Sequence, residues 1–181
     1  MHSVSSSGGE TNGAGSAPAA SLQPAVSLRV GDPAPTWECA GVDGTTGEAR
    51  RYCSEEFVGS PLLLVFYPAD NSPVCTQQLI EHTAGIQQLL DRGANLVTSS
   101  PQGSESHREF ADQHGGFRFP MLCDVDLALG AAFGVLGLLG HYRRSTILVN
   151  AEGTINYVQR SVGSGTGFKP LAELLVLLDN A

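Results

Sequence analysis

Charged residues, cysteines and long apolar runs are all scarce in this 181-residue chain. Charged side chains make up only 15% of it, which excludes a long coiled coil and a charge-driven disordered chain. No apolar run approaches the ~20 residues of a membrane-spanning helix, so we expect no membrane partner. The 10 basic residues are outnumbered by 18 acidic ones, which argues against nucleic acid as a partner.

Cysteine and histidine patterns exclude several further classes. Four cysteines are too few for a disulfide scaffold, and no CxxC pair is present, which argues against a zinc knuckle and a dithiol oxidoreductase. The five histidines show neither HxxxH nor HExxH spacing. We therefore expect no metal ion and no cofactor. The low cysteine count and the lack of a secretory leader favour a cytoplasmic protein.

Composition changes once along the chain, near Leu28. Residues 1–27 are rich in Ser, Gly, Ala and Pro and carry almost no bulky side chains. Such a segment buries too little apolar area to offset the entropy lost on ordering, so we predict a disordered tail. No second break follows, and residues 28–181 are predicted to form one domain with a sizeable core.

Strand and helix patterns alternate through this domain. The predicted strands cover Thr36–Ala40, Glu48–Tyr52, Leu62–Tyr67, Asn95–Ser99, Thr146–Asn150 and Thr154–Gln159. The predicted helices cover Val74–Asp91, Ser104–His114, Asp126–Phe133 and a C-terminal segment entered by Pro170. The first two strands form an N-terminal β-hairpin around Asp43 and Gly44. This order predicts an α/β fold with a central sheet and helices on both of its faces.

The helices also carry predictions at the level of single residues. The buried side of the first helix is expected to carry Leu79, Ile86, Leu89 and Leu90. Ser104 is expected to cap the second helix. The apolar side of the last helix is expected to carry Leu171, Leu174, Leu175 and Leu178.

Chemistry is indicated where the buried strand Leu62–Tyr67 passes into the first helix. Cys75 falls in the first turn of that helix, beside unpaired backbone N–H groups and the positive end of the helix dipole. Both favour thiolate over thiol, and the thiolate is the nucleophile. Ser72 stands three residues earlier, within reach of a group bound near the sulfur. Pro68 lies at the start of the loop and stiffens it.

The same residues also fit a purely structural arrangement. Free cysteine is among the most buried residue types, and a serine three residues before it can simply cap the helix. The spacing of Ser72 and Cys75 does not by itself separate this interpretation from a reactive site.

Five segments resemble the peroxiredoxin family, and they occur in the family's order. Pro68-x-x-x-Ser72-x-x-Cys75 is similar to the family's Pro-x-x-x-Thr/Ser-x-x-Cys signature, and the other four segments are Val30–Pro35, Ser106–Phe110, Phe119–Asp124 and Arg143–Asn150 with Gly153. Of these segments, Ser106–Phe110 and Phe119–Asp124 resemble the Q-type, or bacterioferritin comigratory protein, branch of the family. The resemblance covers nearly all of residues 28–178 and implies a thioredoxin-like fold with a central mixed sheet.

The resemblance also implies a role for each matching residue. Cys75 would be the peroxidatic cysteine, which attacks the terminal peroxide oxygen and becomes sulfenic acid. Ser72 would hydrogen-bond the peroxide, and Pro68 would shield the sulfur from water. Arg144 would stabilise the thiolate and the charge on the leaving oxygen. Without the resemblance, Arg144 fits a solvated surface arginine beside Arg143.

The chain departs from the family pattern at several positions. Glutamine stands at position 78, where glutamate is common in this branch, and the two usual places for a resolving cysteine hold Ile80 and Ala111. The remaining candidates are Cys39, Cys53 and Cys123. Cys39 and Cys53 are expected to be core residues or partners of each other, because they fall on paired strands. A one-cysteine mechanism, with an external thiol resolving the sulfenic acid, is therefore predicted.

The predicted function is a thiol-dependent peroxidase that reduces hydrogen peroxide and organic hydroperoxides. Its expected partners are the hydroperoxide and thioredoxin or another thiol reductant, and it is expected to be a monomer or homodimer. Two alternatives remain. One is a peroxide-responsive redox sensor with little turnover, and the other is a thiol–disulfide oxidoreductase, which the absence of CxxC disfavours.

Overall fold

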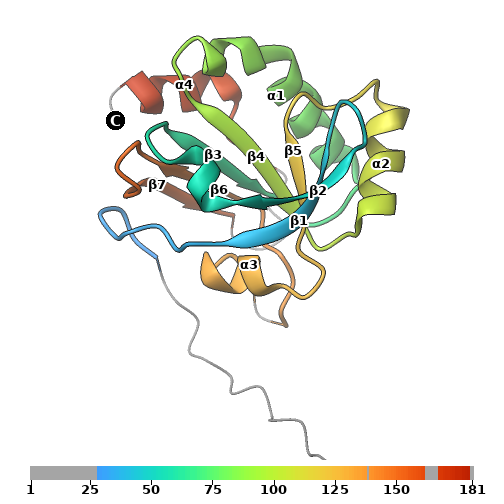
Figure 1. The fold of residues 1–181 in the computed structure, drawn as a ribbon, viewed down its shortest axis with the longest axis horizontal. Coiled ribbons are helices and arrows are strands. Elements are labelled where there is room, and N and C mark those ends of the chain that lie inside the picture. Colours follow the sequence, from blue (N-terminus) through green and yellow to red (C-terminus); the bar gives the residue numbers. More distant parts are fainter. Residues whose placement is uncertain (1–27, 138, 162–166, 180–181) are drawn as a thin grey trace, which may run out of the picture.

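A seven-stranded mixed sheet, with strand order β2-β1-β5-β4-β3-β6-β7, forms the centre of the fold (Figure 1). The computed structural model describes residues 28–137, 139–161 and 167–179. The tail predicted over residues 1–27 and the last two residues of the predicted domain lie outside the described residues.

The elements follow the predicted alternation. The strands are β1 (Glu38–Asp43), β2 (Ala49–Cys53), β3 (Leu62–Phe66), β4 (Asn95–Ser100), β5 (Pro120–Cys123), β6 (Ser145–Val149) and β7 (Ile155–Arg160). The helices are α1 (Pro73–Leu90), α2 (Ser104–Gln113), α3 (Ala128–Ala132) and α4 (Leu171–Asp179), with a short 3₁₀ turn, η1, at Ser54–Phe57. The N-terminal hairpin β1–β2 and the C-terminal hairpin β6–β7 both form as predicted.

Strand β3 lies at the centre of the domain and is buried on both faces. It pairs in parallel with β4 and antiparallel with β6. Leu63 and Val65 pack into the core beneath α1, α2 and α4, whereas Leu64 and Phe66 pack into a second core that includes residues of α3. This explains why β3 is continuously apolar in sequence, as strands covered on both faces are.

Two of the sheet's pairings fix the place of the site. Strands β3, β4 and β5 run parallel, so their carboxyl ends meet at one edge of the sheet. Strand β6 runs the opposite way beside β3, and its first residue, Ser145, lies opposite Phe66, the last residue of β3. The chain just after β3 and the chain just before β6 are therefore neighbours.

Two local predictions were wrong. Leu90 is 46% exposed, whereas the buried face of α1 carries Cys75, Gln78, Leu79, His82, Ile86 and Leu89. Leu89 already occupies that face, and the next residue along a helix points about 100° away from it. Ser104 is the first residue of α2 rather than its cap, because Gly103 takes the cap position and no side chain bonds there.

Strand β5 was not predicted from the sequence. This strand has only four residues and begins with a proline, so neither its length nor its composition signals a strand. It forms because β1 and β4 flank it on either side.

In the described part of the chain, no helix is both long and apolar enough to cross a membrane.

Candidate active site

The loop between β3 and α1 places Cys75 in the first turn of α1, at the carboxyl edge of the sheet. Pro73 is the first residue of the helix, and Ser72 is its N-cap. The Ser72 hydroxyl oxygen accepts a hydrogen bond from the backbone N–H of Cys75 at 3.4 Å. Cys75 itself is fully buried. Ser72 is thus the helix cap that the sequence analysis considered. The same hydrogen bond fixes the first turn of α1, which carries the sulfur of Cys75.

Arg144 reaches the sulfur from the other side of the site. It stands just before β6, and its Nη2 donates to Cys75 Sγ at 3.2 Å. Its side chain is buried, since only 8% of the residue is exposed. The neighbouring Arg143 points elsewhere and donates to the backbone carbonyl of Gly134 at 3.0 Å. Arg144 is therefore not a solvated surface arginine, which was the alternative that the sequence left open.

Gln78, which is not among the site residues predicted from the sequence, completes this buried contact. Its Oε1 accepts a hydrogen bond from Nη1 of Arg144, and the residue is fully buried. The spacing held a signal for this, because a residue three positions after Cys75 lies on the same face of a helix. Arg144 therefore bridges two residues of α1, the cysteine and the glutamine.

Several buried polar atoms on α1, and one on Arg144 beside it, lack a protein partner. Within the described residues, Gln78 Nε2, Arg144 Nε and both ring nitrogens of His82 lack hydrogen-bond partners. Burial lowers the pKa of His82 to about 4, so its ring is neutral at neutral pH. Buried polar atoms normally have hydrogen-bond partners in folded proteins, so these atoms are exceptions to that rule.

Pro68 lies in the same loop but is exposed. The structure thus brings Ser72, Cys75 and Arg144 together, and it does not place Pro68 in a described contact with the sulfur. Shielding of the sulfur by Pro68 stays a prediction.

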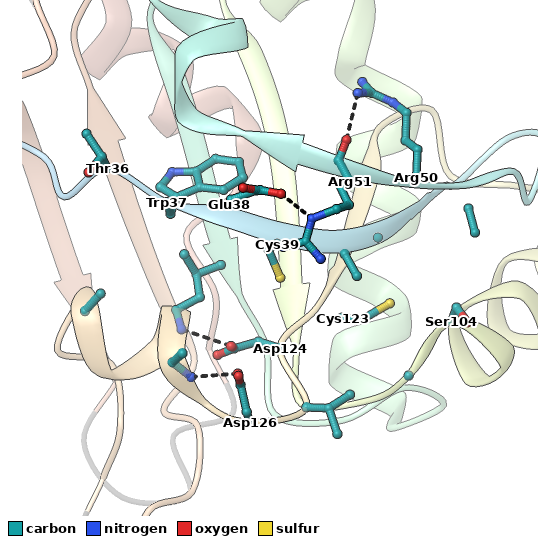
Figure 2. Close-up of a pocket in the computed structure, with 18 residues that line it drawn as sticks. Thr36, Trp37, Glu38, Cys39, Arg50, Arg51, Ser104, Cys123, Asp124 and Asp126 are labelled. Carbon is teal, nitrogen blue, oxygen red and sulfur yellow. Dashed lines mark hydrogen bonds and ion pairs between the residues drawn. The ribbon is translucent and has the colours of Figure 1, made fainter. Parts of the chain in front are cut away.

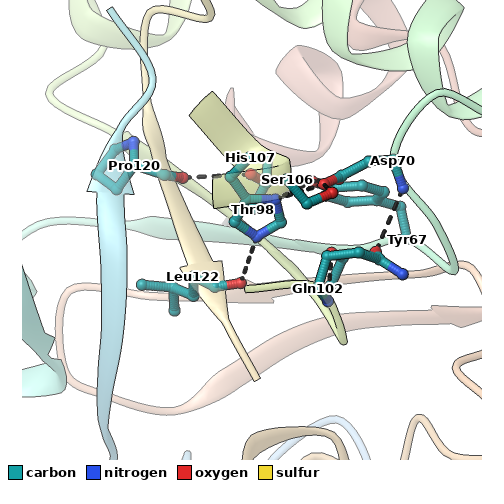
Figure 3. Close-up of polar contacts among 9 residues, drawn as sticks. Tyr67, Asp70, Thr98, Gln102, Ser106, His107, Pro120 and Leu122 are labelled. Carbon is teal, nitrogen blue, oxygen red and sulfur yellow. Dashed lines mark hydrogen bonds and ion pairs between the residues drawn. The ribbon is translucent and has the colours of Figure 1, made fainter. Parts of the chain in front are cut away.

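A buried ion pair ties the loop before Cys75 to α2 (Figure 3). The Asp70 carboxylate contacts His107 Nδ1 at 2.9 Å, and it accepts from the hydroxyls of Ser106 at 2.6 Å and Tyr67 at 2.8 Å. On its far side, His107 Nε2 lies 3.1 Å from the backbone carbonyl oxygen of Leu122 in β5. With a carboxylate on one nitrogen and a carbonyl on the other, the ring is placed to donate from both, as an imidazolium does.

The pKa values of the two groups agree with a charged pair. Burial alone would lower the pKa of His107, but its interactions with Asp70 and with Cys123 outweigh burial and raise that pKa to about 9. Burial would likewise raise the pKa of Asp70, but His107, Ser106 and Tyr67 hold it below its usual range. Both groups therefore carry their charges at neutral pH.

The other three cysteines lie on strands away from Cys75. All four cysteines are free thiols. Cys123 ends β5, which β4 separates from β3, and Cys39 and Cys53 lie farther out on β1 and β2. Cys39 and Cys123 both line a cavity of about 930 Å³ (Figure 2). Burial, and then the charge of Asp124, raise the pKa of the Cys39 thiol to about 12.

The pairing of Cys39 with Cys53, considered from sequence, does not fit the register of the hairpin. Cys39 lies opposite Tyr52, and Cys53 lies opposite Glu38. Residues opposite each other share a face of the sheet, and successive residues alternate between faces. Cys39 and Cys53 therefore point to opposite faces. Among the described residues, no group of three or more His, Cys, Asp or Glu could hold a metal ion.

Comparison with known proteins agrees with this architecture. The model of the AhpC/TSA family matches residues 30–158. Peroxiredoxin Bcp of Bacillus subtilis is 28% identical over 137 residues, which cover 72% of this chain and 83% of the relative. The structure of AhpC from Mycobacterium tuberculosis matches with a TM-score of 0.77 at 25% identity, over 84% of this chain and 92% of its own. The bacterioferritin comigratory protein of Xanthomonas campestris matches with a TM-score of 0.66 at 26% identity, over 78% and 90% of the two chains.

The chain therefore belongs to the AhpC/TSA family, as a peroxiredoxin of the Bcp and peroxiredoxin Q type. The thioredoxin-like α/β fold expected from the sequence is confirmed. With the family comes its activity, the reduction of peroxides by a thiol-dependent peroxidase. A peroxide substrate and a thiol reductant are the corresponding partners.

The Asp70–His107 pair predicts a pH dependence of stability. A histidine whose pKa is about 9 when folded and 6.5 otherwise stabilises the fold fully below about pH 6.5 and loses this effect as the pH rises through about 9. We expect the free energy of unfolding to contain a contribution of about 3 kcal/mol that vanishes over this range. Urea unfolding of the wild type and His107→Gln at several pH values measures it.

The wild-type advantage over His107→Gln should be largest near pH 6 and shrink toward pH 10. His141→Gln is the control, because His141 is an exposed histidine. Parallel stability curves for the wild type and His107→Gln would show that the imidazolium contributes nothing.

Proposed function

We propose that this peroxiredoxin reduces hydroperoxides through Cys75 as its peroxidatic cysteine. The observation that carries the proposal is the 3.2 Å contact between Arg144 Nη2 and Cys75 Sγ in a buried site. A guanidinium beside the sulfur and the positive end of α1 beneath it both favour the thiolate. Hydrogen peroxide and organic hydroperoxides are the proposed substrates, and the Xanthomonas relative was solved in connection with alkyl peroxide reduction.

The reaction proposed is a displacement at oxygen. The Cys75 thiolate attacks the terminal oxygen of the hydroperoxide, so that an S–O bond forms as the O–O bond breaks. Cys75 becomes sulfenic acid, and the departing alkoxide or hydroxide takes up a proton to leave as alcohol or water. The positive charge of Arg144 stabilises the negative charge on the leaving oxygen.

Ser72 is proposed to orient the peroxide. Its oxygen already accepts from the Cys75 backbone N–H, which leaves its hydroxyl proton free to be donated to a peroxide oxygen. The unpartnered N–H groups of Gln78 and Arg144 are further donors on the same side. Pro68, exposed in the loop, is proposed to cover the sulfur when the peroxide is bound.

A one-cysteine cycle is proposed for the return to the thiol. Strand β4 stands between the strand that leads to Cys75 and the strand that ends in Cys123, and Cys39 and Cys53 are farther across the sheet. An external thiol would condense with the sulfenic acid and release water, and a second thiol would displace it as a disulfide and restore Cys75.

The reductant, the oligomeric state and the extent of the folded domain are also part of the proposal. Thioredoxin or another cytoplasmic thiol would supply the electrons, and the protein would act as a monomer or homodimer. The folded unit would be residues 28–181, preceded by the tail of residues 1–27. The sensor and thiol–disulfide oxidoreductase alternatives are not favoured, because the relatives are peroxiredoxins.

Replacing Cys75 tests the assignment directly. Cys75→Ser should abolish peroxide consumption with a thiol donor, because the hydroxyl at that position is not ionised at neutral pH. Cys53→Ser, which changes a partly exposed thiol at the end of β2, should keep most of the activity. Turnover retained by Cys75→Ser would refute the role of this residue.

Peptide mapping tests the one-cysteine cycle. One equivalent of peroxide should convert Cys75 to a sulfenic acid, which a small thiol then captures as a mixed disulfide. The measurement is intact mass followed by non-reducing peptide mass spectrometry, with and without the trapping thiol. A disulfide between Cys75 and Cys123, or another internal cysteine, in most molecules would overturn the proposed cycle.

A further inference from the structure

A second thiol with a charged partner lies outside the site around Cys75. Cys123 is the last residue of β5 and directly follows Leu122, whose backbone carbonyl oxygen is 3.1 Å from His107 Nε2. The strand therefore places the cysteine next to the ring, and a hydrogen bond with Cys123 is one of the interactions that raise the pKa of His107 to about 9. Cys123 is partly exposed, whereas Cys75 is fully buried.

Cys123, His107 and Asp70 form a chain of a thiol, an imidazolium and a carboxylate. Asp70 meets the ring at Nδ1, at 2.9 Å, whereas β5 meets it at Nε2. The carboxylate thus fixes the orientation of the ring and keeps it charged at neutral pH. A cation beside a cysteine favours its thiolate, which is the form that attacks disulfides. The reaction proposed for Cys75 uses none of these three residues.

Cys123 lies at the wall of a cavity that can hold a small molecule. The cavity measures about 930 Å³, and its lining includes Cys123, Ser104 at the start of α2, and Arg50 and Arg51 of β2 (Figure 2). Sites for small molecules in proteins typically measure ~300–1,000 Å³. A thiol in this position can therefore exchange with a small disulfide bound in the cavity.

Cys39 lines the same cavity but is set up differently. It packs into the second core, and burial, and then Asp124, raise the pKa of its thiol to about 12, so it stays protonated at neutral pH. Alternation along β5 puts Cys123 on the same face as Met121, which belongs to the core beneath α1, α2 and α4. The two thiols therefore lie on opposite faces of the sheet.

We propose that Cys123 is a second reactive thiol, which takes up low-molecular-weight thiols from their disulfides at this cavity. Its thiolate attacks one sulfur of the small disulfide, so that a new S–S bond forms as the old one breaks. The electron pair leaves with the other sulfur as a thiolate, which takes up a proton from water. One disulfide, which is the oxidant, thus yields one mixed disulfide on Cys123 and one free thiol.

The test exposes the folded full-length chain to glutathione disulfide, used as a probe of this class. Non-reducing peptide mass spectrometry follows the modification of each cysteine over time. Cys53 is the matched control thiol, because it is also partly exposed at the end of a strand. Partial burial, and then Glu55, raise the pKa of the Cys53 thiol. Cys123 should therefore be modified at least ~10-fold faster than Cys53, with Cys39 slower still.

Replacing the histidine tests the role of its charge. His107→Gln should slow the modification of Cys123 about 10-fold, because the thiolate loses its cationic partner. His114→Gln is the control, since His114 is the exposed histidine at the end of the same helix, and it should match the wild type. Far-UV circular dichroism checks that both variants are folded. If His107→Gln does not fold, the comparison of Cys123 with Cys53 in the wild type decides.

Equal rates at Cys123 and Cys53 would overturn the proposal, as would an undiminished rate at Cys123 in folded His107→Gln. A disulfide between Cys39 and Cys123 in place of the mixed disulfide would do the same. The experiment is repeated in Cys75→Ser, where Cys123 should react as in the wild type. A peroxidase assay of the wild type tests the role of Cys75 separately, so either proposal can fail while the other stands.

Discussion

The contact between the guanidinium of Arg144 and the sulfur of Cys75 is the interaction on which this site depends. The two residues are 69 positions apart, and the sheet brings them together. The last residue of β3 and the first residue of β6 lie opposite each other, so the helix that follows β3 begins beside the arginine that precedes β6. Because β3 is buried on both faces, a one-residue slip in its pairing would exchange its two faces and misplace the contact.

Two buried groups of charged side chains hold the start of α1, one in the loop before it and one on the helix itself. Asp70 and His107 balance each other inside the protein and fix the loop to α2. In the described part of the chain, the Arg144 guanidinium contacts the neutral side-chain amide of Gln78 and the sulfur of Cys75 rather than a carboxylate. The first group therefore gives the loop a fixed position, whereas the second holds a positive charge beside the sulfur.

Local sequence patterns predicted the parts of the protein that depend on neighbours in the chain. The apolar run of β3, the start of α1 and the position of Cys75 followed from periodicity and from the first-turn position, and motif resemblance pointed to Arg144. What the sequence did not reveal depends on contacts across the sheet. Asp70 and His107 are 37 residues apart, Gln78 and Arg144 are 66 apart, and β5 is a strand only because two neighbours pair with it. No local pattern encodes such contacts, although the three-residue spacing between Cys75 and Gln78 is a local signal that both lie on one face of the helix.

The most direct test of the central claim is the pH dependence of peroxide oxidation in Arg144→Ala and Arg143→Ala. Arg143 is the matched control, because it is the adjacent arginine and donates to a backbone carbonyl rather than to the sulfur. The account predicts that Arg144→Ala oxidises ~10–100-fold more slowly at neutral pH and keeps a deficit at high pH, where the thiol ionises without help. Arg143→Ala should follow the wild-type profile. A silent Arg144→Ala, or a damaging Arg143→Ala in its place, would contradict the account.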